Sequence, residues 1–153
     1  SGAIINDGFD QLARAQKKSY DVVYIQLGAN DIITLKHMPS SLKLLERLFD
    51  EASKKSDHVM YIYAGNIADV PIWDPLLKRV YEYRSKYFHA HVKEIASKKS
   101  ILYIDLYSQG NIFNSDPDRY YANDMIHLSS DGYAEWFSII IQSLHTSWKE
   151  LTH

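Results

Sequence analysis

Three short apolar runs divide the chain, at residues 22–27, 58–64 and 101–106. Each run is nearly continuous in apolar side chains, which is typical of a strand covered on both faces of a parallel sheet. Apolar residues at helical spacing occur before, between and after these runs, in residues 8–18, 40–54, about 74–98 and from about 130 onward. Strands that alternate with helices predict an α/β fold with right-handed crossovers. We expect a single domain over residues 1–153.

Turn and cap residues mark where the predicted helices begin. Pro39-Ser40-Ser41 opens the second helix, and Asp74-Pro75 combines a capping carboxylate with a proline suited to the first turn of the third. Ser129-Ser130 precedes the last helix in the same way. These serines are therefore interpreted as helix caps.

Composition narrows the function classes without selecting one. The 153 residues are 46% hydrophobic and 24% charged, as in an ordinary globular domain, and the formal net charge is −2. This charge gives no basis for nucleic acid or an anionic membrane surface as a partner. No apolar run approaches the roughly 20 residues of a transmembrane helix. The chain has no cysteine, which excludes disulfides and thiolate chemistry but leaves the localisation unknown.

Polar motifs follow the predicted strands. Gly28-Ala29-Asn30-Asp31 comes after the first strand, Gly65-Asn66 after the second, and Asp124 and His127 lie on the long loop after the third. Binding sites of open parallel sheets lie outside the carboxyl ends of the strands. We therefore expect these motifs to meet at one rim of the sheet.

Asp124 and His127 have the spacing of an acid–base pair. An imidazole can take a proton from a hydroxyl near neutral pH, and a carboxylate on its other ring nitrogen fixes the tautomer. An aspartate three residues before a histidine can reach that nitrogen within one turn of chain. The spacing alone is common, so it supports a catalytic hypothesis only in combination with other features.

Asn30 is a candidate for stabilising an oxyanion. Preorganised N–H donors stabilise the negative oxygen of a tetrahedral intermediate, and a side-chain amide at a strand end can be such a donor. Gly28 would permit the tight turn and a close approach of substrate. Asp31 is interpreted as a brace for this loop. The alternative is that Asn30 and Asp31 form only a turn.

The combination of motifs resembles the SGNH (GDSL-type) hydrolases along essentially the whole chain. Gly28-Ala29-Asn30-Asp31 is similar to their Gly-x-Asn-Asp block. The segment from Tyr121 to Tyr133, which contains Asp124-Met125-Ile126-His127, is similar to their final block, Asp-x-x-His-Pro-Ser-x-x-Gly-Tyr. Ser1-Gly2, followed by the helix near Gly8, resembles the second block, whose glycine N–H enters the oxyanion hole.

The resemblance implies a three-layer α/β/α sandwich, flavodoxin-like in this family's manner, that hydrolyses carboxylic esters as an esterase or lipase. It implies His127 as the base, Asp124 as its partner, and Asn30 and Gly2 as oxyanion-hole donors. It implies no cofactor. Small-molecule acyl esters, including short acyl esters, lysophospholipids and acetylated sugars, are the implied substrates.

The chain departs from the family pattern at its start. The Gly-Asp-Ser block, which carries the nucleophilic serine, would lie upstream of Ser1, so the family's first two strands are expected to be missing. Leu128 replaces the usual proline after the histidine. We therefore predict that this chain alone is inactive. The exposed edge at residues 22–27 should pair with the missing N-terminal segment or with another chain.

Other residues give weaker hypotheses. Ser1 could act as an N-terminal nucleophile, and Ser108 is a remote alternative. His89 and His91 point about 200° apart on a helix, so they cannot share a metal ion, and we predict no metal site. Trp73 is preferred over Tyr120 or Tyr121 as a lining residue of an acyl pocket.

Two other functions remain open at this point. A catalytically inactive binding module on the same fold would follow if the intact protein also lacked the serine. A nucleotide- or phosphate-binding α/β domain ranks third, because the chain has no glycine-rich phosphate loop of either common type.

Overall fold

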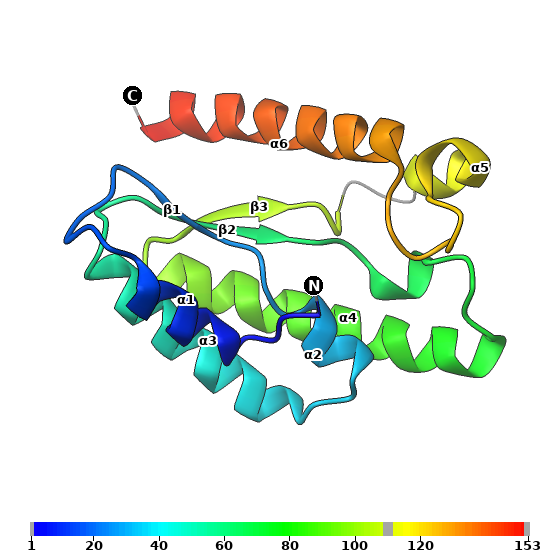
Figure 1. Ribbon diagram of the computed structural model, residues 1–153, viewed down its shortest axis with the longest axis horizontal. Coiled ribbons are helices and arrows are strands. Elements are labelled where there is room, and N and C mark those ends of the chain that lie inside the picture. The colour runs from blue at the N-terminus through cyan, green and yellow to red at the C-terminus, as the bar shows by residue number, and fades with distance from the viewer. Residues whose placement is uncertain (1, 109–111, 152–153) are drawn as a thin grey trace.

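A parallel sheet of three strands forms the centre of the computed structural model, which describes residues 2–108 and 112–151 (Figure 1). The strands are β1 (Val23–Ile25), β2 (Val59–Tyr63) and β3 (Leu102–Asp105), in the order β1-β2-β3. Val23 pairs with Val59, and Tyr61 pairs with Tyr103. All three predicted strands are thus confirmed, each shorter than its apolar run.

Helices cover both faces of the sheet (Figure 1). Helix α6 (Ser130–Leu151) lies on one face, and α1 (Asp7–Arg14), α3 (Met38–Ser53) and α4 (Pro75–Lys98) lie on the other. Short elements occupy the connections: α2 (Ala29–Ile33), η1 (Ile67–Asp69), η2 (Ile112–Ser115) and α5 (Pro117–Tyr120). The predicted α/β/α sandwich is therefore confirmed. No helix in the described part of the chain is long and apolar enough to span a membrane.

The core has one hydrophobic cluster on each side of the sheet. On the α3–α4 side, Phe49, Tyr61 and Phe88 are fully buried. On the α6 side, Ile104 and Ile140 are buried in a smaller cluster. Each such side chain stabilises the fold by about 1.5–3 kcal/mol through removal from water. The two clusters hold the strand ends, and the loops that follow them, in fixed positions.

The observed N-termini of the helices agree only in part with those predicted from the sequence. The carboxylate of Asp74 accepts hydrogen bonds from Leu76 N at 2.9 Å and Leu77 N at 3.1 Å, which confirms the cap of α4. Helix α3 instead begins at Met38, so Ser40 and Ser41 lie inside it. The prediction that they cap this helix is wrong, because Pro39 occupies the first turn and moves the start towards the N-terminus.

Strand β1 lies at an edge of the sheet, with β2 as its partner among the described residues. Tyr24 and Val22 are 65% and 50% exposed, although the run around them is apolar. An apolar strand edge of this kind presents unpaired backbone groups to an additional strand. Its position agrees with the edge expected for residues 22–27.

Candidate active site

The carboxylate of Asp124 and the imidazole of His127 are in direct contact. Asp124 Oδ2 lies 2.7 Å from His127 Nδ1, and Asp124 Oδ1 accepts hydrogen bonds from the backbone N–H groups of His127 at 2.9 Å and Ile126 at 3.0 Å. Met125 takes a positive φ of 55° in the tight turn between them. The loop thus folds onto the aspartate and aims it at the ring, as the three-residue spacing predicts.

These hydrogen bonds keep Asp124 ionised. The bond to His127, reinforced by the backbone N–H groups of His127 and Ile126, lowers the pKa of Asp124 to about 2. An ionised carboxylate only accepts, so Nδ1 of His127 is the donor, and in the neutral imidazole this tautomer leaves the lone pair on Nε2. The side chain of His127 is 66% exposed, and no described residue bonds to Nε2. Nε2 is therefore open to a hydroxyl nucleophile.

The chain after His127 returns to pack against the loop before it. Tyr121 and Leu128 form an isolated antiparallel bridge, and Ala122 N donates to His127 O at 2.8 Å. Ser129 Oγ accepts from Gly132 N at 3.1 Å in the first turn of α6, which confirms Ser129 as a cap. The residues around His127 are therefore anchored to the start of α6.

Asp31 ties three segments together from a buried position. Its side chain is 2% exposed, and its two carboxylate oxygens accept from Ile5 N and Ser41 Oγ, each at 2.9 Å. A buried carboxylate is tolerated when its oxygens are hydrogen-bonded in this way. These contacts attach the N-terminal segment and α3 to the loop that holds Asn30.

Asn30 lies beside the N-terminal segment. Its side-chain Nδ2 donates to Ala3 O at 2.8 Å, which brings the amide next to the residue that follows Gly2. The amide has a second N–H, for which no described residue is an acceptor. Gly2 takes a positive φ of 62°, and its N–H has no acceptor among the described residues. The structure therefore places the Asn30 amide beside the segment that contains Gly2, the other predicted oxyanion donor.

Gly28 is the N-cap of α2, with a positive φ of 113°. A Cβ at this position would lie 2.8 Å from the ring of Phe88. The ring of Phe88 fills the space that a side chain at this position would need, and the close approach of substrate at Gly28 stays a prediction. The sequence signal for a turn is correct, but helix α2 itself was not predicted.

One pocket borders the Asn30 loop, another borders the His127 loop, and the two have Ala64, Gly65 and Ile67 in common. A small pocket runs from Leu27 and Ala29 to the segment of residues 64–67. A larger pocket of about 150 Å³ is lined by the same segment and by Ile126 and Leu128, which flank His127. Figure 1 shows α2, the segment after β2 and the loop between α5 and α6 at the end of the sheet to which the strands point. Both motifs thus adjoin one rim.

Sequence reasoning missed Asp69 and Trp136, which line the larger pocket. Asn66, expected at this rim, and Tyr121, the less favoured lining candidate, also line it. Trp73 does not line it, because its indole Nε1 donates to Ile67 O at 2.7 Å and its ring packs against Tyr81. The position of Gly65-Asn66 at a strand end was the signal that could have pointed to this segment. Trp136 gave no separate signal, because it fits the apolar pattern of α6.

The serine candidates do not contact His127 in the described part of the chain. Ser108 Oγ donates to Asp105 Oδ2 at 2.8 Å, and Asp105 in turn contacts His89 at 3.0 Å. This order places the carboxylate between the hydroxyl and the imidazole, so the histidine cannot take the serine proton. Ser1 lies outside the described residues.

The two histidines considered for metal binding have separate partners. His89 contacts Asp105, whereas His91 hydrogen-bonds to Tyr87 O at 2.8 Å and packs on the Tyr87 ring. No group of three or more potential metal-ligating side chains occurs among the residues that the structure describes.

Comparison with known proteins identifies relatives of both sequence and fold. The profile of the GDSL-like Lipase/Acylhydrolase family matches residues 1–135. The acetylxylan esterase Axe2 from Geobacillus stearothermophilus superposes with a TM-score of 0.73 at 18% identity, covering 94% of this chain and 68% of that chain. LAE5, an alpha/beta hydrolase enzyme from the metagenome of Lake Arreo, Spain, gives 0.72 at 15% identity with the same coverage. No curated protein matches the sequence.

Proposed function

The chain belongs to the GDSL-like lipase/acylhydrolase family, and on this premise we propose that it hydrolyses carboxylic esters with His127 as the general base. The observation that carries the proposal is the 2.7 Å contact between Asp124 and His127, which leaves Nε2 open. Asp124 is the residue that orients His127. Asn30 and Gly2 are proposed as donors to the oxyanion.

The proposed reaction has two halves. Nε2 of His127 takes the proton of a serine hydroxyl as its oxygen attacks the acyl carbon, and Asp124 stabilises the imidazolium. The second amide N–H of Asn30 and the N–H of Gly2 bind the oxyanion. The intermediate collapses to an acyl-serine, and His127 gives its proton to the departing alcohol. Water, activated by the same histidine, then releases the acid and restores the serine.

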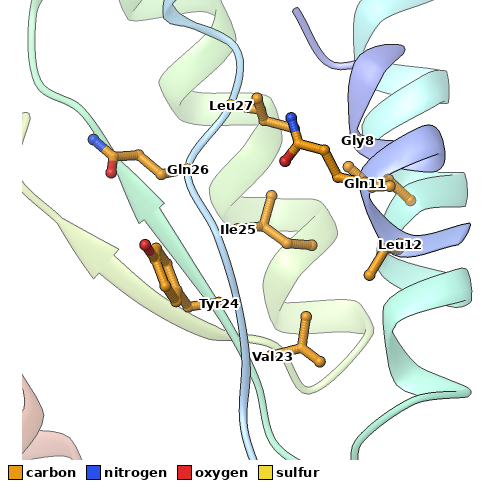
Figure 2. Close-up of a pocket in the computed structure, with 9 residues that line it drawn as sticks. Gly8, Gln11, Leu12, Val23, Tyr24, Ile25, Gln26 and Leu27 are labelled. Atoms are coloured by element: carbon orange, nitrogen blue, oxygen red, sulfur yellow. The ribbon is translucent and has the colours of Figure 1, made fainter. Parts of the chain in front are cut away.

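We infer that the serine is contributed by residues that precede Ser1, on a strand that pairs with β1. A pocket of about 380 Å³ lies between β1 and α1. Figure 2 shows Val23, Ile25 and Leu27 on the side of β1 that faces Gln11 and Leu12, with Tyr24 and Gln26 on the opposite side. The free edge of β1 thus has space on one face for the side chains of an added strand.

The other face of β1 supports the same inference. A second pocket, of about 360 Å³, lies between the sheet and α6 and is lined by Tyr24, Met60 and Phe137 among other apolar residues. Tyr24 is 65% exposed and Phe137 is 60% exposed. A parallel strand beside β1 would cover both side chains. Its carboxyl end would point to the rim where His127 and Asn30 lie, which suits the family's Gly-Asp-Ser block.

The structural relatives guide the choice of substrate. Axe2 is named an acetylxylan esterase, and acetylated sugars are among the substrate classes that the family resemblance implies. We propose esters of short acids, acetate first, as substrates.

Steady-state hydrolysis of 4-nitrophenyl acetate by the full-length gene product tests the proposal. His127→Ala should lower kcat by at least about 10³-fold, since base catalysis and nucleophile activation are lost together. Asp124→Asn should lower kcat with little change in KM, because it disturbs the imidazole rather than substrate binding. Replacement of His145, on α6, by alanine is the control and should leave the rate unchanged. Activity that survives His127→Ala, or none in the parent protein, would contradict the proposal.

A further inference from the structure

The larger pocket beside His127 has walls of two chemical kinds. Most of its lining is apolar: Leu106, Phe113, Ile126, Leu128 and Trp136. Asn66 and Asp69, which have polar side chains, line the same pocket. Binding sites for small molecules combine an apolar surface with a few placed polar groups that fix the orientation of the ligand. The pocket therefore has the character of a binding site rather than of a packing gap.

Asp69 is held in place from three directions. Asn66 Nδ2 donates to its carboxylate Oδ1 at 3.2 Å. Its backbone carbonyl accepts from Asn114 Nδ2 at 2.7 Å and lies 3.5 Å from the hydroxyl of Tyr121. Tyr121 pairs with Leu128, the neighbour of His127. The position of Asp69 is therefore coupled to the loop that carries the catalytic base.

One carboxylate oxygen of Asp69 is available for a ligand. Oδ1 is bonded to Asn66, whereas no described residue donates to Oδ2. Burial raises the pKa of Asp69, Lys78 opposes that effect, and Glu82 adds to it. A partly desolvated carboxylate oxygen gains from a hydroxyl donor, because a hydrogen bond to a charged acceptor is about twice as strong as a neutral one.

We propose that Asp69 accepts a hydrogen bond from a hydroxyl group of the alcohol part of the substrate. The inference rests on the proposed ester hydrolysis and deepens it. The preferred substrates are partial esters of neutral polyhydroxy alcohols, whose carbon skeleton contacts the apolar wall formed with Trp136. An alcohol that carries an anionic group near the ester is disfavoured, because it would bring a second negative charge to Asp69.

The test compares two acetate esters on the full-length gene product. Glycerol monoacetate carries free hydroxyl groups, whereas 4-nitrophenyl acetate has none in its alcohol part. Asp69→Ala should lower kcat/KM for the glycerol ester about 10–100-fold, the loss expected for one hydrogen bond to a charged group. The value for 4-nitrophenyl acetate should stay within about twofold. Asp118→Ala, an exposed aspartate on α5, is the matched control and should change neither.

A second readout does not depend on turnover of the polyol ester. Free glycerol should inhibit hydrolysis of 4-nitrophenyl acetate competitively, and Asp69→Ala should weaken that inhibition by a similar factor. Asp69→Asn retains a neutral acceptor and should give an intermediate loss, which also serves if the alanine variant fails to fold.

The outcomes separate this inference from the function on which it rests. If the parent protein hydrolyses neither ester, the proposed function fails. If it hydrolyses the aryl ester but Asp69→Ala lowers both rates equally, or changes neither rate, the hydroxyl-binding role of Asp69 is overturned.

Discussion

The carboxylate of Asp31 and the hydroxyl of Ser41 form a buried hydrogen bond of 2.9 Å between the Asn30 loop and α3. The other carboxylate oxygen of Asp31 holds the backbone N–H of Ile5. One side chain therefore sets the relation between the two segments that contribute the proposed oxyanion donors. Stability and site geometry are linked through it.

Asp31→Ala should destabilise the protein by about 2–5 kcal/mol, because it leaves the N–H of Ile5 and the hydroxyl of Ser41 without an acceptor in a buried place. Ser41→Ala removes one donor from the same carboxylate and should cost about 1 kcal/mol. Urea unfolding measures both values. Equal losses from the two variants would contradict the bracing role.

Gly28→Ala should be more destabilising than Gly65→Ala. Both glycines have positive φ, so alanine strains either backbone, but a Cβ at Gly28 also meets the Phe88 ring at 2.8 Å while a Cβ at Gly65 meets no atom within 4 Å. We expect alanine at Gly65 to lower the free energy of unfolding by about 1–2 kcal/mol through backbone strain alone. Alanine at Gly28 should lower it by about 1–3 kcal/mol more. Thermal unfolding gives the difference, and Phe88→Leu should reduce it.

Tyr103→Phe should stabilise the protein by about 1 kcal/mol, because the buried hydroxyl of Tyr103 has no hydrogen-bond partner among the described residues. Tyr61→Phe is the matched control. It removes a hydrogen bond of 2.6 Å to Leu27 O and should destabilise by about 1 kcal/mol. If both variants changed the free energy of unfolding in the same direction, hydrogen bonding of the hydroxyl would not explain the effect of removing it.

Asp105 makes stability depend on pH. Burial alone would raise its pKa, but hydrogen bonds from Ser108 and His89 bring the pKa below the ordinary value. The carboxylate therefore stabilises the fold above the unfolded pKa of about 3.9, and this contribution is lost as the pH falls through the folded value. Asp105→Asn should lower Tm at pH 7, by about 2–4 °C for each kcal/mol lost, and the difference from the parent should narrow below about pH 4.

The matched variant for this pH series is Asp118→Asn, because Asp118 is an exposed aspartate on α5. Its Tm should follow that of the parent protein at every pH. A difference at Asp105 that stays constant from pH 7 to pH 3 would mean that lost packing, rather than lost charge, causes the destabilisation.

Local signals in the sequence were enough to predict the three strands and their alternation with helices, whereas the three-layer arrangement was implied by the family resemblance. Continuous apolar runs identify the three strands, and Asp74-Pro75 specifies a helix start through contacts within one turn. The Asp124–His127 contact is equally local, since it spans three residues. Such features depend on neighbours in sequence, which a single chain displays directly.

Features set by distant contacts could not be predicted in the same way. Serine is a common helix-capping residue, but Ser41 lies inside α3, where its hydroxyl donates a hydrogen bond to Asp31 of another element. Trp136 follows the apolar pattern of α6, and only the three-dimensional structure shows that it reaches the pocket beside His127. Asp69 likewise gains its surroundings from Asn114 and Tyr121, more than 40 residues away in sequence.

The most direct test of the central claim is fluorophosphonate labelling of the full-length gene product, with the labelled peptide identified by mass spectrometry. The proposed mechanism predicts a label on one serine from a segment that precedes Ser1, lost in His127→Ala and retained in His145→Ala. A label on a serine within residues 1–153, or one that persists in His127→Ala, would contradict it. Absence of label from the folded protein would contradict it as well and would favour a binding module on the same fold.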